Sequence, residues 1–253
     1  MSATLDVTGT QSVPMSRLIK AEVRKMSDTR AGMWLLIVIG AITAIVTIAF
    51  FIWGHKEDRT WGTLAAFGGI PLGFLLPVLG ILLVTQEWGQ RTALVTFTQV
   101  PHRERIIVAK VVAALVFGLA GLLIAFALGA ILAPIGGAPD PFSDFSVPIM
   151  LRIALGQIIG LAIGLSFGML LLNSAFAIVL YFAIPIVVSI VGGVWTAARD
   201  KLLWFDLNTS SSQLYETVSP TGKEWAQIGT GTLIWIVIPG AIGIWRIMRS
   251  EVK

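Results

Sequence analysis

The sequence contains no cysteine, only two histidines and few charged residues, which make up 13% of its 253 positions. The lack of cysteine excludes disulfide bonds, thiolate metal ligands, cysteine nucleophiles and cysteine-linked lipid anchors. The charged fraction is about half of the roughly 25% that is typical of soluble domains. Hydrophobic residues, by contrast, account for 56% of the chain, and its mean hydropathy is +0.86. A water-soluble fold is therefore not expected.

Five long windows contain no Asp, Glu, Lys or Arg: residues 31–54, 60–86, 111–139, 153–198 and 225–245. Each is long enough for a membrane-spanning helix, which needs about 20 apolar residues. The fourth would form a helix of about 69 Å, roughly twice the hydrocarbon core, so it must turn back. Asn173-Ser174 at its midpoint supplies the turn. We therefore expect an all-α polytopic membrane protein with six transmembrane helices in a domain over residues 31–245, near residues 33–54, 64–85, 107–132, 148–172, 175–195 and 226–245.

The distribution of charge predicts the orientation of these spans. Six spans place both termini on one side, and most of the 18 Lys and Arg residues fall on that side. Because basic residues favour the inner side of a membrane, both termini should be cytoplasmic. We expect residues 1–15 to be disordered and residues 246–253 to form a cytoplasmic tail. The basic residues are dispersed along the membrane edges and form no continuous groove, so no nucleic-acid partner is expected.

Residues 16–30 have the pattern of an amphipathic helix. One helical stripe carries Leu18, Ile19, Val23 and Met26, whereas most basic residues lie elsewhere on the helix. This pattern predicts an interfacial helix that contacts membrane lipids in the headgroup plane. The alternative is a charge cluster that only sets the topology.

The segment between the second and third spans is long enough to do more than connect them. We expect a short helix near residues 92–100, capped by Thr92, with Leu94 and Phe97 on one face. Pro101 disfavours its continuation through Val100. A short helix held between two spans is suited to transmit force from a soluble partner, and a passive hairpin is the alternative.

This segment also resembles a known family. Glu87, Trp88, Thr92, Pro101, Arg103 and Lys110 are similar to the Glu-aromatic…Thr…Pro-x-Arg…Lys pattern of bacterial, actinobacterial-type permeases of the type-2 ATP-binding-cassette (ABC) export class. Residues 202–208 and 235–253 also resemble members of that class. The resemblance implies a coupling helix near residues 92–100. The residues expected to couple to an ATPase are Glu87, Arg91, Thr92, Leu94, Phe97, Pro101, Arg103 and Arg105.

The same resemblance implies the partners and the activity. The chain would be a permease subunit in the bacterial plasma membrane, paired with a second copy or a paralogue. A cytoplasmic ABC ATPase would bind ATP and Mg²⁺, and this chain itself would bind no cofactor. The complex would export an amphipathic, lipid-like, drug or peptide substrate by alternating access. Residues 196–225 would form the outer loop, either as short re-entrant helices or as an ordinary loop.

Two other functions stay open at this stage. One is a membrane sensor or immunity subunit of an ABC-type complex that moves no substrate. The other is an ATP-independent secondary carrier, which is disfavoured because charges are lacking within the spans and the two halves show no evident repeat.

Two motifs within the fourth span need separate interpretation. Gly164-Leu165-Ser166-Phe167-Gly168 matches a nucleophile elbow, but His55 and His102 are expected in loops on opposite sides of the membrane. We therefore expect no catalytic residue, no metal site and no enzyme activity in this chain. Glycines recur every fourth residue and predict a smooth ridge for close helix packing, within the subunit or, alternatively, at a dimer contact. They are Gly156, Gly160, Gly164 and Gly168.

Overall fold

The computed structural model of the chain describes residues 13–90, 92–100, 102–195, 199–216 and 218–249. Within these residues the fold is all-α and contains no strand, and six helical segments are long and apolar enough to cross a membrane. The expected class, an all-α polytopic membrane protein with six spanning helices, is confirmed. The α-helices are α1 (Met15–Asp28), α2 (Arg30–Trp53), α3 (Trp61–Gly89), α4 (Ala93–Gln99), α5 (Arg103–Leu132), α6 (Val147–Leu171), α7 (Ser174–Val194), α8 (Arg199–Leu202), α9 (Leu207–Ser211), α10 (Gly222–Thr232) and α11 (Ile238–Arg249).

Four shorter segments complete the described helices. Three are 3₁₀ turns, η1 (Lys56–Asp58), η2 (Ala133–Ile135) and η4 (Ser212–Tyr215). The fourth, η5 (Leu233–Val237), is a π-helix that joins α10 to α11. The sixth spanning segment is therefore α10, η5 and α11 together.

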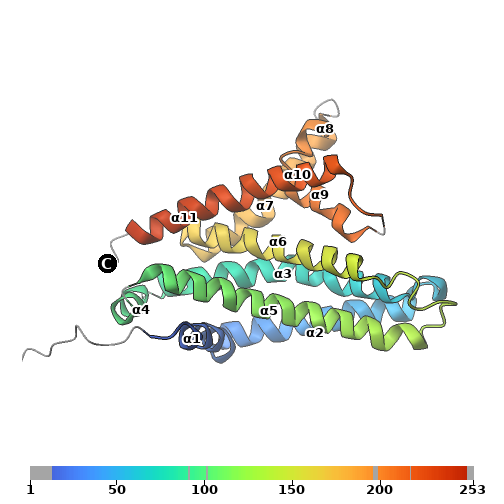
Figure 1. Ribbon diagram of the computed structural model, residues 1–253, viewed down its shortest axis with the longest axis horizontal. Helices are drawn as coiled ribbons and strands as arrows, with labels where there is room; N and C mark the ends of the chain where they lie inside the picture. The colour runs from blue at the N-terminus through green and yellow to red at the C-terminus, as the bar shows by residue number, and fades with distance from the viewer. Residues whose placement is uncertain (1–12, 91, 101, 196–198, 217, 250–253) are drawn as a thin grey trace, which may run out of the picture.

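The centre of the bundle is formed by α3 and α6, which are the most buried of the spanning helices. Helix α3 packs against α2, α5 and α6, and α6 packs in turn against α7 and α11 (Figure 1). Leucines of α3 and α6 form the largest group in the main core cluster. By contrast, Ala177 is the only buried residue of α7, and the others are half-buried or exposed. An exposed apolar face of this kind is expected where a helix meets lipid or another membrane protein.

The long fourth charge-free window is divided as the sequence predicts. Helix α6 ends at Leu171, and Leu172 adopts the left-handed conformation with φ = 52°. Asn173 then caps α7, because its side-chain oxygen accepts a hydrogen bond from the Phe176 N–H at 3.0 Å.

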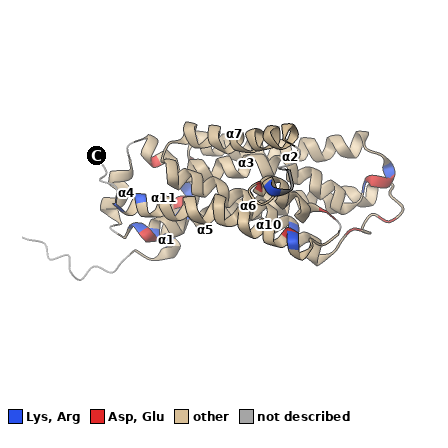
Figure 2. Ribbon diagram, turned by 90° about the horizontal axis from the view of Figure 1, so that it is seen from above, with Lys and Arg blue, Asp and Glu red and all other residues tan. Residues whose placement is uncertain are grey.

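The charges lie mainly outside the long apolar helices. Helices α1 and α4 and the C-terminal end of α11 share one end of the bundle (Figure 1). Charged residues gather at this end, at the opposite end and around α10, whereas the helices between them are nearly free of charge (Figure 2). The end that contains α1, α4 and the end of α11 is called the terminal end below.

Candidate functional site

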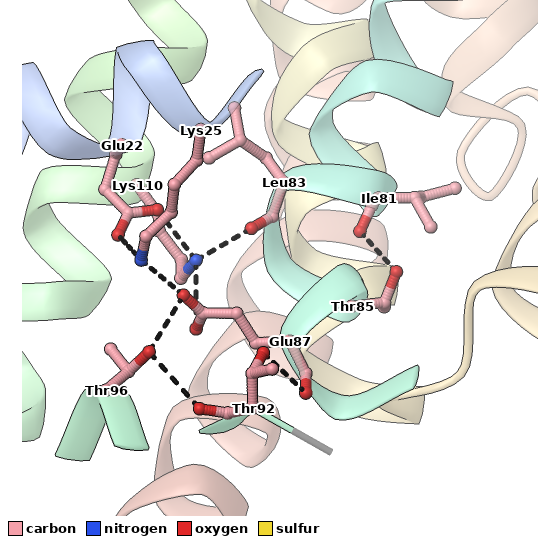
Figure 3. A network of polar contacts seen from close by, with 9 residues as sticks. All are labelled: Glu22, Lys25, Ile81, Leu83, Thr85, Glu87, Thr92, Thr96 and Lys110. Carbon is pink, nitrogen blue, oxygen red and sulfur yellow. Dashed lines mark hydrogen bonds and ion pairs between the residues drawn. The ribbon is translucent and has the colours of Figure 1, made fainter. Parts of the chain in front are cut away.

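A cluster of four charged side chains joins three helices at the terminal end of the bundle. Glu22 and Lys25 come from α1, Glu87 comes from α3 and Lys110 comes from α5 (Figure 3). Lys25 Nζ lies 2.7 Å from Glu22 Oε1 and 2.5 Å from Glu87 Oε1. Lys110 Nζ lies 2.8 Å from Glu22 Oε2 and 3.3 Å from Glu87 Oε2. Each lysine therefore bridges both glutamates, and we call these four residues the charge cluster.

Three members of the charge cluster are almost completely buried. The exposed fractions are 4% for Glu22, 5% for Glu87 and 6% for Lys110. Burial of a charge is costly unless it is paired and hydrogen-bonded. Here two carboxylates balance two ammonium groups, and Lys110 also donates to the Leu83 carbonyl at 2.9 Å. The three donors of Lys110 are thereby all satisfied.

Lys25 is the most exposed member of the charge cluster and belongs to the helix outside the spans. Burial lowers the pKa of Lys25, but the carboxylates of Glu22 and Glu87 raise it by more, so that the pKa lies above its usual value of 10.5. Lys25 is therefore positively charged throughout the physiological pH range. Its charge pairs with Glu87 and thereby links α1 to the end of α3.

Glu87 also holds the short helix α4. Its side chain accepts a hydrogen bond from Thr96 Oγ1 at 3.2 Å, and its backbone carbonyl accepts one from the Thr92 N–H at 2.9 Å. The expected helix near residues 92–100 is present as Ala93–Gln99. The capping role expected of the Thr92 side chain is wrong, because its hydroxyl points back to the Glu87 carbonyl at 3.5 Å and accepts no bond from the first turn of α4. The first turn of α4 is instead fixed to the last turn of α3.

A second set of contacts fixes α4 from its other side. The guanidinium carbon of Arg103 lies 4.7 Å from the centre of the Phe97 ring, at cation–π distance. Arg103 Nη1 donates to the Ile247 carbonyl of α11 at 2.6 Å. The ring centres of Phe97 and Trp88 of α3 lie 6.2 Å apart. Phe97 and Arg103 thus connect α4 to α3, α5 and α11. Arg105 Nη2 donates to the Val13 carbonyl that precedes α1, at 2.6 Å.

The two apolar residues expected to share a face of α4 lie in different environments. Phe97 contacts the main core cluster, whereas Leu94 is 48% exposed and its neighbour Val95 is 55% exposed. Leu94 and Val95 therefore form the outward apolar surface of α4. A groove of about 400 Å³ separates α4 from α1, and residues of the charge cluster line its floor. Two further residues expected to couple to an ATPase, Arg91 and Pro101, lie outside the described residues.

Helix α1 directs part of its apolar stripe at protein rather than outward. Met26 is fully buried and, with Val23, packs into the main core cluster, while Leu18 and Ile19 are half-buried. Glu22 lies on the same face between Leu18 and Met26. An acidic residue at i, i+4 spacing within an apolar stripe is the local sequence signal for the charge cluster. Glu22, Lys25 and Thr96 are the site residues that the sequence analysis missed.

The glycine ridge of α6 lies against two different partners within the chain. A Cβ atom on Gly164 would come within 2.1 Å of the Pro77 carbonyl oxygen, and one on Gly168 within 3.2 Å of Ile81 Cα, so both glycines admit the α3 backbone. A Cβ on Gly156 would meet the Tyr215 hydroxyl at 2.6 Å, whereas one on Gly160 would have ordinary contacts. The ridge therefore packs on α3 and on η4.

Part of the segment expected as the outer loop folds back against the helices. Leu207 of α9 and Leu214 of η4 are buried in one cluster with Ile159 of α6 and Ile228 of α10. Because Ile159 lies near the middle of α6, this segment reaches well below the helix ends.

The serine of the elbow-like motif has a structural partner. Ser166 Oγ donates to the Ile236 carbonyl at 3.0 Å, in the π-helical η5. His102 lies 3.0 Å from Glu104 at the surface of the terminal end. Ser166 therefore completes the hydrogen bonding of an irregular helix.

The spanning helices extend beyond the ranges expected from apolar composition. Helix α3 continues to Gly89 and α5 begins at Arg103, so Glu87 lies inside a helix rather than in the expected connection, whereas Lys110 lies within the span expected near residues 107–132. With Arg152, which the sequence places near the entrance of the fourth span, they are buried ionisable residues of the spanning helices. The sequence matches no protein-family model and no curated protein.

Proposed function

We propose that this chain is the permease subunit of an ATP-driven exporter of the type-2 ABC class, in the bacterial plasma membrane with both termini cytoplasmic. A cytoplasmic ABC ATPase that binds ATP and Mg²⁺ would be its partner, together with a second permease copy or a paralogue. The observation that carries the proposal is the position of Glu87, which joins α1, α4 and α5 to the end of α3. The cargo would be an amphipathic compound moved by alternating access.

The exposed surface of α4 supports a docking role. Leu94 and Val95 are exposed at the terminal end, and Val95 also lines the groove beside α1, while Ala93 and Phe97 pack inward. An apolar pair at the end of a short, firmly held helix is suited to a pocket on a soluble partner. The excess of basic residues at the terminal end supports its cytoplasmic location, where such an ATPase would be found.

The buried charges explain how motion of α4 would reach the spans. Separation of a buried ion pair leaves an uncompensated charge, which costs about 3–5 kcal/mol. Helices α1, α3, α4 and α5 should therefore move together at the terminal end. ATP binding can drive transport only if ATP-bound and ATP-free partners favour different permease conformations. The charge cluster would transmit that preference from α4 to α3.

The experiment is affinity purification of the tagged chain from its native membrane in mild detergent, followed by mass spectrometry. We expect an approximately equimolar cytoplasmic protein with a phosphate-binding loop. The double variant Leu94→Asp/Val95→Asp should reduce its recovery by roughly tenfold or more, because two charges would enter an apolar contact.

Val218→Asp is the matched control, because Val218 is 77% exposed and lies in the outer segment, outside α4. This variant should recover the ATPase in full. Reproducible absence of an ATPase from the intact parent complex would contradict the proposal and favour a secondary carrier. Full recovery with the α4 double variant would contradict the role of α4.

A further inference from the structure

Two hollows meet inside the helix bundle, well away from the charge cluster. Their volumes are about 330 and 320 Å³, and both are lined by Gly73, Tyr181, Asn208 and Tyr215. These volumes are at the lower end of the range for small-molecule binding sites, which is about 300–1,000 Å³. Gly73 lies near the middle of α3, so the shared wall is at mid-depth of the bundle. We call this space the tyrosine cavity, because the two tyrosines of the chain both line it.

The backbone of the bundle is arranged to place these tyrosines. Pro77 has no N–H, so the Gly73 carbonyl four residues earlier lacks its usual helical donor. Tyr181 Oη fills that role and donates to the Gly73 carbonyl at 3.1 Å. Tyr215 enters from η4, where its hydroxyl occupies the space that a Cβ on Gly156 would take. A proline and a glycine thereby fix the two phenol groups from different helices.

Two side chains that line both hollows have no hydrogen-bond partner among the described residues: the Tyr215 hydroxyl, on a half-buried residue, and the Asn208 amide, on an exposed one. Thr209, Ser211 and Ser212 add hydroxyl groups to one of the hollows. Gln157 Oε1 is also without a partner, but it is buried behind Gly73 and lines neither hollow. The polar groups that face the hollows can donate to and accept from the hydroxyl or amide groups of a ligand. Burial also raises the pKa of Tyr215 to about 12, so it remains a neutral donor.

The remaining walls of the tyrosine cavity carry no charge. Neither hollow has Asp, Glu, Lys, Arg or His among its described lining residues. Phe67, Ile70 and Phe74 form the apolar side, and Ile70 and Phe74 are 49% and 57% exposed. The cavity therefore continues to the exposed surface of α3, where an apolar chain could extend.

We propose that the tyrosine cavity binds an uncharged amphipathic molecule. Its hydroxyl or amide groups bond to Asn208, Tyr215 and Tyr181, and its apolar chain lies along Ile70 and Phe74. A charged head group is excluded, because no counter-charge lines either hollow and burial of an unpaired charge is costly. That this molecule is the exported cargo rests on the proposed function, whereas its binding to the cavity does not.

The two tyrosines provide a direct probe of this site. The full chain is labelled with 3-fluorotyrosine in lipid nanodiscs, so that ¹⁹F NMR reports two residues, assigned with Tyr181→Phe and Tyr215→Phe. Monodecanoylglycerol is titrated as the neutral probe, with decyltrimethylammonium and decyl phosphate as charged probes of equal chain length. We expect saturable shifts of both resonances with the neutral probe alone. No saturable shift, or equal shifts with all three probes, would overturn the proposal.

Variants locate the binding on the cavity. Asn208→Leu should weaken binding of the neutral probe about tenfold, since it removes hydrogen bonds to the ligand. Gln213→Leu is the matched control, because Gln213 lies in η4 but lines neither hollow, and it should bind like the parent. Parental binding by Asn208→Leu would overturn the assignment. The ¹⁹F spectrum without probe verifies that each variant is folded.

The assay contains no ATPase, so it separates the two proposals. Binding of the neutral probe by a chain that recovers no ATPase would contradict the exporter proposal and support the binding site in the tyrosine cavity. Recovery of an ATPase without probe binding would support the exporter proposal and contradict the binding site.

Discussion

Lys110 carries a positive charge into the bundle, and three acceptors surround its ammonium group. Glu22 and Glu87 supply carboxylates, and Leu83 supplies a backbone carbonyl. The pair of Lys110 with Glu22 joins residues 88 positions apart in the chain, and it ties α1 to α5. Because both side chains are nearly fully buried, loss of either one leaves the charge cluster with one unbalanced buried charge.

The first prediction concerns Glu22. Glu22→Gln should destabilise the folded chain by about 3–5 kcal/mol, since it leaves one positive charge of the charge cluster unbalanced. The measurement is the midpoint of thermal unfolding in detergent, which should fall. Glu104→Gln is the control, because the Glu104 side chain is 55% exposed, and its midpoint should stay unchanged.

Addition of Lys110→Met to Glu22→Gln should recover much of the lost stability, because the unpaired buried charge is then removed as well. An additive loss in the double variant would contradict the idea that the two residues stabilise α1 as a pair.

From the sequence, Glu87 was predicted as a site residue only because its segment resembles a permease family, and Glu22 was not predicted. The reason is physical. The stripe of Leu18, Val23 and Met26 identifies the buried face of α1, but the partner of an acid on that face is set by the packing of α1 on α5. Tertiary pairing of this kind is not encoded in the local pattern of one helix.

At the scale of elements, local composition was sufficient to predict the six spanning helices, because a segment in lipid must be apolar and must satisfy its own backbone hydrogen bonds. It was insufficient for their ends, since α3 and α5 continue as helices past the apolar windows. The return of α9 and η4 to the bundle was left open, because Leu207 and Leu214 pack against Ile159 of α6, which is remote from them in sequence. The sequence of η5 contains no local signal for a π-helix other than the nearby Pro239.

The glycine ridge of α6 gives a prediction with its own matched control. Gly164→Ala should destabilise the chain by about 3 kcal/mol, at the upper end of the usual range for overpacking, because its Cβ would lie 2.1 Å from a backbone oxygen of α3. Gly160→Ala, one helical turn away, should change stability little, since its nearest contact would be 3.6 Å. Thermal unfolding of the two variants in detergent provides the comparison. Equal midpoints would contradict the packing of this ridge on α3.

At the scale of the whole molecule, α3 connects the two places where chemistry is concentrated. Glu87 belongs to the charge cluster at the terminal end, and Gly73 belongs to the tyrosine cavity. At 1.5 Å per residue these positions are about 21 Å apart along one helix. Pro77 lies between them and frees the carbonyl that binds Tyr181. In the proposed exporter, motion at α4 would therefore reach the cavity through α3.

The most direct test of the proposed coupling uses the cysteine-free background of the chain. Leu94→Cys places the single thiol on the exposed surface of α4, and Val218→Cys places it in the segment expected as the outer loop. A thiol-reactive photocrosslinker is attached in native membranes, and the crosslinked proteins are identified by mass spectrometry. We predict that position 94 captures a cytoplasmic ATPase with a phosphate-binding loop and that position 218 does not. Capture of no ATPase at position 94, in membranes where the labelled chain is intact and folded, would contradict the assignment of α4 as the coupling helix.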